Sequence, residues 1–177
     1  MFNMDKFIAF SYLIEKFKDW YCELRSDNNY EKRFTKLFLL KMLFLVAAVK
    51  NEDGTDLLDI FNNFHALPYG PVESDIYNTI SLDGIPNYTI SDRNIKSKDP
   101  EVLNLTEFEK NLLNKSVDQV RQKNGNLITL SPFDLVQITH KWESWDKAFN
   151  YAKFTGSRSA KMKSEWIRND ITSYFGD

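Results

Sequence analysis

The chain has 177 residues, 42% of them hydrophobic and 27% charged, with only 6 glycines and 5 prolines. This composition excludes a disordered, collagenous or low-complexity chain, and the length is sufficient for one ordinary hydrophobic core. The formal net charge of −2 argues against a protein that coats duplex nucleic acid, because such proteins usually carry a positive excess. The single cysteine cannot form an internal disulfide, and the first residues do not resemble a secretory leader, so we expect a cytoplasmic protein.

The N-terminal part of the chain predicts two helices of different character. Apolar residues at spacings of three and four predict an amphipathic helix over 5–24, the main part of an aromatic N-terminal segment 1–30. From Thr35 to Lys50 nearly every residue is apolar, with Lys41 inside the run. The run is shorter than the roughly 20 residues of a membrane span, so we predict a central buried helix. The residues expected to be buried there are Leu37, Phe38, Leu40, Met42, Leu43, Phe44 and Val46.

The middle of the chain combines clear and ambiguous signals. Residues 56–67 are compatible with a short helix followed by an extended stretch, and the pattern leaves the type open. The Gly70-Pro71 step predicts the start of a helix from Pro71 to about Ile80, because proline suits the first helical turn. Residues 82–104 are mostly polar, with a strand-like group at 88–90, and they predict a long loop with room for a small β-hairpin.

The second half of the chain predicts further helices. Thr106 and Glu109 have the spacing of a capping box, and the helix they open should stop near Gly125. Ser131 and the residues after it predict a helix to about His140, followed by helices over 144–154 and within 159–175. The expected fold is mainly α, a compact single-domain bundle of about six to seven helices over residues 1–177, with the helix near 35–50 at its centre.

The residues that usually carry catalysis or bind cofactors are sparse. His65 and His140 are the only histidines, and neither they nor Cys22 has the spacing of a metal site. Glycine-rich phosphate-binding patterns are absent from the sequence, so we expect no metal, no nucleotide and no other cofactor. Cys22 lies in an aromatic helix, where a buried structural cysteine is the usual outcome. We therefore expect no catalytic residues and no enzyme, and an unrecognised hydrolase is the least favoured interpretation.

Two features allow a binding function. Aromatic residues make up 15% of the chain, and Tyr69, Tyr77, Trp142 and Trp145 stand beside predicted turns or helix ends, where such rings can anchor an interface. The C-terminal part is locally basic, and it could contact phosphate or form an ordinary solvated helix face, which is the favoured interpretation. The basic residues are Lys153, Arg158, Lys161, Lys163 and Arg168.

Three segments in order resemble the Panacea domain family, a domain of unknown function that includes the SocA-type antitoxins of bacterial toxin–antitoxin systems. The resemblance extends over about 35–175, and the chain differs from the family pattern at Leu39 or Leu40, where the family has glutamine, and at Phe44, where it has tyrosine. The matching segments are Lys36 to Phe44; Phe64 to Val72 with Tyr77; and Leu130-Ser131 with Leu135, Thr139, His140 and Trp145; a weaker match is Ile167, Ile171 and Tyr174-Phe175.

The resemblance implies a mainly helical antitoxin that neutralises a cognate toxin, encoded nearby, by direct contact and without catalytic residues. We expect the second and third segments to lie close together and to bind the partner or support the interface. The alternative is a DNA-binding autorepressor that uses the basic C-terminal residues. For His140, at a helix C-terminus that favours an imidazolium, a structural hydrogen bond is slightly favoured over partner contact. The candidate site residues are Tyr69, Gly70, Pro71, Tyr77, Thr139, His140 and Trp145.

Overall fold

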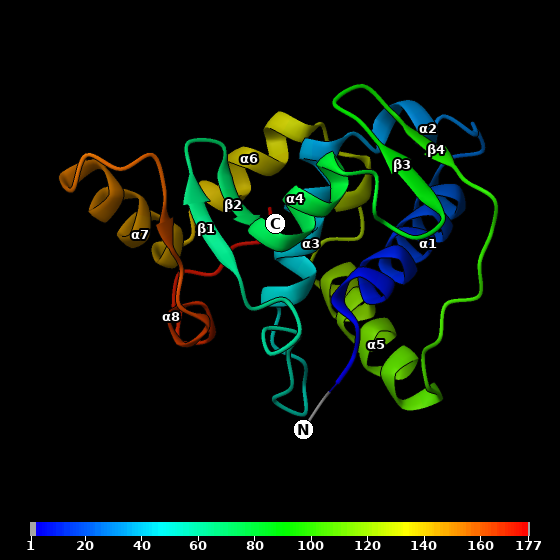
Figure 1. The fold of residues 1–177 in the computed structure, drawn as a ribbon. Coiled ribbons are helices and arrows are strands. Elements are labelled where there is room, and N and C mark those ends of the chain that lie inside the picture. Colours follow the sequence, from blue (N-terminus) through cyan, green and yellow to red (C-terminus); the bar gives the residue numbers. More distant parts are fainter. Residues whose placement is uncertain (1–2, 177) are drawn as a thin grey trace.

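The computed structural model describes residues 3–176, and its fold is mainly helical and compact, with two small antiparallel sheets (Figure 1). The described residues form eight α-helices, of which the short helix α2 was not predicted from the sequence. The helices are α1 (Lys6–Leu24), α2 (Tyr30–Arg33), α3 (Lys36–Ala48), α4 (Ser74–Ser81), α5 (Glu107–Lys123), α6 (Pro132–His140), α7 (Glu143–Phe154) and α8 (Ser164–Arg168), with a 3-10 turn at Leu127–Thr129.

Side-chain caps fix where the helices begin. The Asp5 carboxylate accepts hydrogen bonds from the first amides of α1, and the Thr35 hydroxyl accepts one from Phe38 at the start of α3. The predicted capping box of Thr106 and Glu109 is present at α5, and an equivalent box of Ser131 and Asp134 opens α6. Each cap satisfies amide groups that have no partner inside the helix, so these starts were predictable from sequence.

Helix α3 is buried on every face from Phe38 to Ala48. It contacts α1, α5, α6 and strand β2. Leu37, expected to be buried, is partly exposed because it borders a surface pocket described below. Within the part of the chain that the structure describes, neither α3 nor any other helix has the length and apolarity that a bilayer span requires.

The segment around Gly70-Pro71 differs from the prediction. Strand β1 (Phe64–Leu67) pairs antiparallel with β2 (Gly70–Glu73), with Phe64 opposite Glu73 and Leu67 opposite Gly70. The predicted helix start at Pro71 is wrong, since α4 begins at Ser74. A Gly-Pro step is compatible with a turn into a helix and with a turn into a strand. Pairing with β1 stabilises the strand.

Strand β1 is the middle strand of its sheet. On its second edge it pairs antiparallel with β5 (Ala160–Lys161), so the sheet order is β2-β1-β5. In Figure 1 the β1–β2 hairpin stands between α7 on one side and α3 and α6 on the other, in agreement with the contacts of these elements. A second sheet, β3 (Tyr88–Ile90) with β4 (Ile95–Ser97), confirms the hairpin predicted within 82–104.

The C-terminal tail docks on the core mostly without helical structure. Only α8 is helical within the predicted helix over 159–175, and the rest contains β5 and turns. The Trp142 indole N–H donates to the Tyr174 carbonyl at 2.8 Å, and the Phe175 ring packs edge-on against Trp142. Ile171, expected on the docking stripe, is 89% exposed. Met162, Ile167 and Phe175 of the predicted stripe are nevertheless buried, so hydrogen bonds to the tail backbone add to apolar docking.

A buried carboxylate joins the N-terminus of α1 to the end of the hairpin. Glu73 has no exposed surface and receives hydrogen bonds from the Lys6 amine at 2.6 Å, the Asn63 amide at 3.2 Å and the Ile76 amide at 2.8 Å. Lys6 also pairs with Asp75 at 2.7 Å. Burial lowers the pKa of Lys6, but the hydrogen bonds and charges of the two carboxylates together outweigh it, so the pKa is raised. The three donors compensate the charge of Glu73 within the protein interior.

We expect Glu73→Gln to lower the free energy of unfolding by about 2 kcal/mol, because an amide N–H₂ cannot accept the hydrogen bonds that now converge on the carboxylate. Urea denaturation of the two proteins measures the difference. Glu107→Gln is the control, since Glu107 pairs with Lys110 at the surface of α5. Equal losses in both variants would contradict a structural role for the Glu73 contacts.

Candidate functional site

The tip of the β1–β2 hairpin is held by side chains from three helices. The Trp145 indole N–H donates to the Leu67 carbonyl at 3.0 Å, and His140 Nε2 lies 3.0 Å from the Pro68 carbonyl. From α3, the Lys41 amine donates to the Pro71 carbonyl at 2.7 Å. Three backbone carbonyls of a tight turn are thus satisfied by side chains far away in sequence. The structure therefore brings together the two segments that the sequence analysis expected to be neighbours.

Gly70 allows the hairpin to approach α3 and α6 closely. Its φ of +97° lies in a region that side chains with a Cβ rarely adopt. A Cβ built on it would lie 2.6 Å from Thr139 Oγ1 and 3.0 Å from Lys41 Cε. Thr139 is itself buried and donates to the Val136 carbonyl inside α6. The role of Thr139 in the described structure is thus to form the surface on which Gly70 packs.

His140 is part of an aromatic stack beside the tip. Its ring stacks on Trp145 with 4.0 Å between centroids, and Trp145 stacks on Phe149 at 4.9 Å. Burial lowers the pKa of His140, the hydrogen bond to Pro68 opposes this, and the nearby Lys41 lowers it further. The expected preference for an imidazolium at the helix end is therefore wrong. A neutral ring whose Nε2–H donates to Pro68 fits both the contact and the direction of the pKa shift.

Lys41 is the most unusual residue of the site. It has no exposed surface, and its amine has one hydrogen-bond partner, the Pro71 carbonyl. No carboxylate of the described residues lies within ion-pair distance of it. Burial lowers the pKa of Lys41 from 10.5 to about 7, because an ammonium in an apolar interior is costly without an opposite charge. The amine therefore has unused hydrogen-bonding capacity in a place that water does not reach.

A surface pocket opens beside Lys41, between α3, the hairpin tip, α4 and the β3–β4 turn. We call it the hairpin pocket, and its volume is about 330 Å³. Tyr69 at the tip is 63% exposed and Tyr77 on α4 is 39% exposed. The Lys36 amine lies 3.8 Å above the centre of the Tyr77 ring. The residues that line the pocket are Lys36, Leu37, Leu40, Lys41, Leu67, Pro68, Tyr69, Val72, Tyr77 and Asp92.

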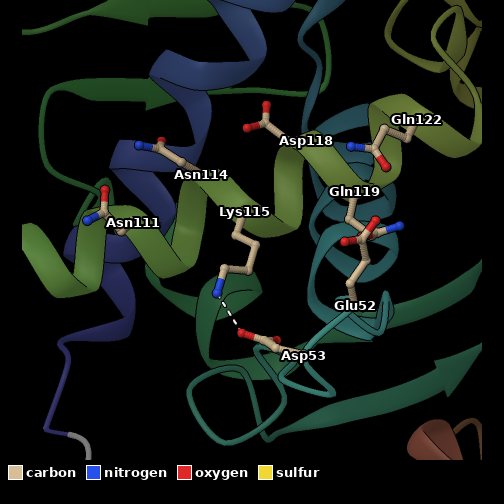
Figure 2. Close-up of a pocket in the computed structure, with 8 residues that line it drawn as sticks. All are labelled: Glu52, Asp53, Asn111, Asn114, Lys115, Asp118, Gln119 and Gln122. Carbon is tan, nitrogen blue, oxygen red and sulfur yellow. Dashed lines mark hydrogen bonds and ion pairs between the residues drawn. The ribbon is translucent and has the colours of Figure 1, made fainter.

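A second hollow, of about 630 Å³, lies between α5 and the turn that follows α3. Figure 2 shows that amide and carboxylate side chains line it and that Lys115 reaches across to Asp53, at 2.6 Å. Asp118 extends away from this pair, on another side of α5. The lining is polar and largely exposed, without a buried group that would give it particular chemistry. The hairpin pocket is the better candidate site because apolar walls and buried polar groups meet there.

The basic C-terminal residues are divided among several local contacts. Arg168 binds the carboxylates of Asp56 and Asp59, at 2.9 and 2.6 Å. Lys153 and Lys163 lie over the rings of Phe149 and Trp166 respectively. Arg158 lies in the turn after α7, and Lys161 is in strand β5. Arg168, one of the two arginines of the set, is therefore engaged with two carboxylates of its own chain.

Sequence reasoning missed two members of the site, Lys36 and Lys41. Both lie in the first segment of the resemblance, which the sequence analysis used for the fold and not for the site. The available signal was Lys41 itself, a charged residue within an otherwise apolar run. Its hydrogen bond to Pro71, 30 residues away, depends on the hairpin and could not be read from the sequence.

Comparison with known proteins adds one finding. The family model described as antitoxin SocA-like, Panacea domain, matches residues 39–146. This range includes Lys41, the β1–β2 hairpin and Trp145, and it excludes α1 and the basic C-terminal residues. No curated protein and no solved structure matches the chain.

We expect Gly70→Ala to lower the free energy of unfolding by about 2 kcal/mol or more, because it combines an unfavourable φ with a steric clash. The double variant with Thr139→Ala should lose less than the sum of the two single variants, since removing Oγ1 relieves part of the clash. Urea denaturation of the wild type, the two single variants and the double variant measures the four free energies of unfolding that the comparison needs. Strict additivity would contradict the close approach of the hairpin to α6.

A second prediction concerns Lys41→Met, which replaces the amine by an apolar group of similar length. Between about pH 7 and 10.5 the unfolded chain binds a proton at Lys41 that the folded chain does not, so wild-type stability should rise with pH in this window. The slope for one proton is about 1.4 kcal/mol per pH unit. The variant should lack this contribution and be more stable than wild type near pH 7. Urea denaturation across the window measures both slopes, and equal slopes would contradict a buried Lys41 amine.

Proposed function

Since the antitoxin SocA-like Panacea model matches more than half of the chain, the protein belongs to that family, and on this premise we propose that it is an antitoxin that neutralises a cognate toxin by direct protein–protein contact. We propose further that the toxin is encoded nearby, that the complex forms in the cytoplasm, and that neutralisation requires no catalysis by this chain. The hairpin tip and the residues around it are the surface that we assign to the toxin.

The observation that supports this proposal is the exposed Tyr69 on a rigid turn. Tyr69 is 63% exposed, whereas the carbonyls of Leu67, Pro68 and Pro71 on either side are each held by a side chain. Tyrosine is among the residues most often found as interface anchors. An anchor on a turn that is already ordered loses little conformational entropy on binding, which favours affinity. The hairpin therefore combines an exposed aromatic group with a preorganised backbone.

The other candidate residues have supporting roles in this proposal. Trp145 is only 7% exposed, so its contribution is to hold the Leu67 carbonyl. His140 and Thr139 support Pro68 and Gly70 in the same way. Tyr77 forms the far wall of the hairpin pocket and is the second exposed ring of the surface. We assign direct contact with the toxin to Tyr69 and Tyr77.

DNA binding by the basic C-terminal residues is less well supported. Arg168 would have to exchange two carboxylate partners for a phosphate. The set also lies outside the range of the family match.

We expect Tyr69→Ala to weaken the complex with the neighbouring toxin by about 2 kcal/mol or more, roughly thirtyfold in affinity, and to abolish rescue of growth on co-expression. Tyr151→Ala is a matched control, because Tyr151 on α7 is also 63% exposed. Pull-down with the toxin and a titration of the purified proteins measure the effect.

Each variant must first give the thermal unfolding transition of the wild-type protein, so that a folding defect is not mistaken for lost contact. Full rescue by folded Tyr69→Ala would place the interface elsewhere. Rescue by the wild type without any physical complex would overturn neutralisation by direct contact.

A further inference from the structure

The hairpin pocket has the composition of a small-molecule site. Leu37, Leu40 and Val72 form apolar surface in it, and the rings of Tyr69 and Tyr77 border it. Its volume of about 330 Å³ lies at the lower end of the range of ligand pockets in proteins. A pocket of this size suits one ring or a short aliphatic chain.

The charges around the pocket are unbalanced. Two lysines line it, Lys36 beside the Tyr77 ring and the buried Lys41, against one carboxylate, that of Asp92 in an exposed turn. Neither amine forms an ion pair with a carboxylate of the described residues. An opposite charge placed in the pocket would therefore gain from both amines, and it would compensate the buried amine of Lys41.

We propose that the hairpin pocket binds a small apolar carboxylic acid, with its ring or aliphatic chain between Tyr69 and Tyr77 and its carboxylate on the side of Lys36 and Lys41. The carboxylate pairs with the amine of Lys36, a partly buried residue. Lys41, which lies beneath the pocket surface, contributes through its charge at short range and needs no direct contact. This binding does not depend on the antitoxin role, although a bound acid would occupy the space between the two tyrosines assigned to the toxin.

The test uses the purified chain and two pairs of probes. Phenylacetate and hexanoate carry the proposed carboxylate, and phenylacetamide and hexanamide have the same shape without the charge. We expect saturable binding of at least one acid at millimolar concentration. The corresponding amide should bind about tenfold more weakly or worse, because it lacks the charge-assisted contact with the amine. Titration calorimetry measures the affinities. Equal affinity for acid and amide, or no binding of either acid, would overturn the proposal.

Variants locate the site. Leu37→Trp should fill the pocket and abolish binding with little effect on the core, because Leu37 is partly exposed. Lys36→Met should weaken the acid about tenfold and leave the amide unchanged, whereas Lys32→Met, on the exposed side of α2, should leave both unchanged. Acid binding that persists in folded Leu37→Trp would place the ligand elsewhere and overturn the assignment.

Proton uptake tests the part assigned to Lys41. Near pH 8 its amine is mostly neutral in the free protein, so a carboxylate nearby should cause a fraction of a proton to be taken up on binding. Calorimetry in buffers of different ionisation enthalpy measures this uptake, and Lys41→Met should abolish it. The other titratable groups around the amine are Lys36, Tyr69, Tyr77, Asp92 and His140. Uptake that is absent in wild type, or unchanged in Lys41→Met, would exclude Lys41 from the site.

Discussion

The burial of the Lys41 amine beneath strand β2 is the constraint on which the arrangement of the hairpin depends. An amine without exposed surface requires an acceptor, and the Pro71 carbonyl supplies it at 2.7 Å. Proline has no backbone N–H, which the edge strand β2 tolerates. The Pro71 carbonyl bonds to Lys41 of α3, and the strand pairs with β1. The contact brings β2 onto α3, and Gly70 then has to lie against both α3 and α6. The exposed position of Tyr69 at the tip follows from this placement.

The hairpin is rigid because its supports come from separate parts of the chain. Lys41 belongs to α3, His140 to the end of α6 and Trp145 to α7, and each satisfies a different carbonyl. A turn held only by its own strands would open easily, since a two-stranded hairpin is marginally stable in water. The same supports make the surface sensitive to distant changes. A substitution in α6 or α7 can alter the shape of the tip without touching a partner.

The features that were predicted best from the sequence depend on residues close to each other in the chain. The caps at Thr106 and Ser131 were predictable because both partners lie within four residues. The β3–β4 hairpin was also within reach, since its strands are close in sequence. The β1–β2 hairpin is an exception, because its strands are equally close in sequence. The Gly70-Pro71 step is compatible with the start of a helix and with the start of a strand, so it did not reveal the pairing with β1. The site was found only in part, because an apolar run containing Lys41 does not reveal which carbonyl the amine will reach.

The wide spacing of these supports also sets the order in which the surface can be completed during synthesis. The hairpin and Lys41 leave the ribosome early, but His140 is 72 residues beyond Pro68, and Trp145 is 78 residues beyond Leu67. Synthesis adds roughly 5–20 residues per second, so His140 and Trp145 are made several seconds after the hairpin tip that they support. Strand β5, near residue 160, arrives later still and completes the sheet. A nascent or prematurely terminated chain therefore has the tyrosine of the tip but lacks the scaffold that orients it, and only a chain translated past Lys161 presents the finished surface.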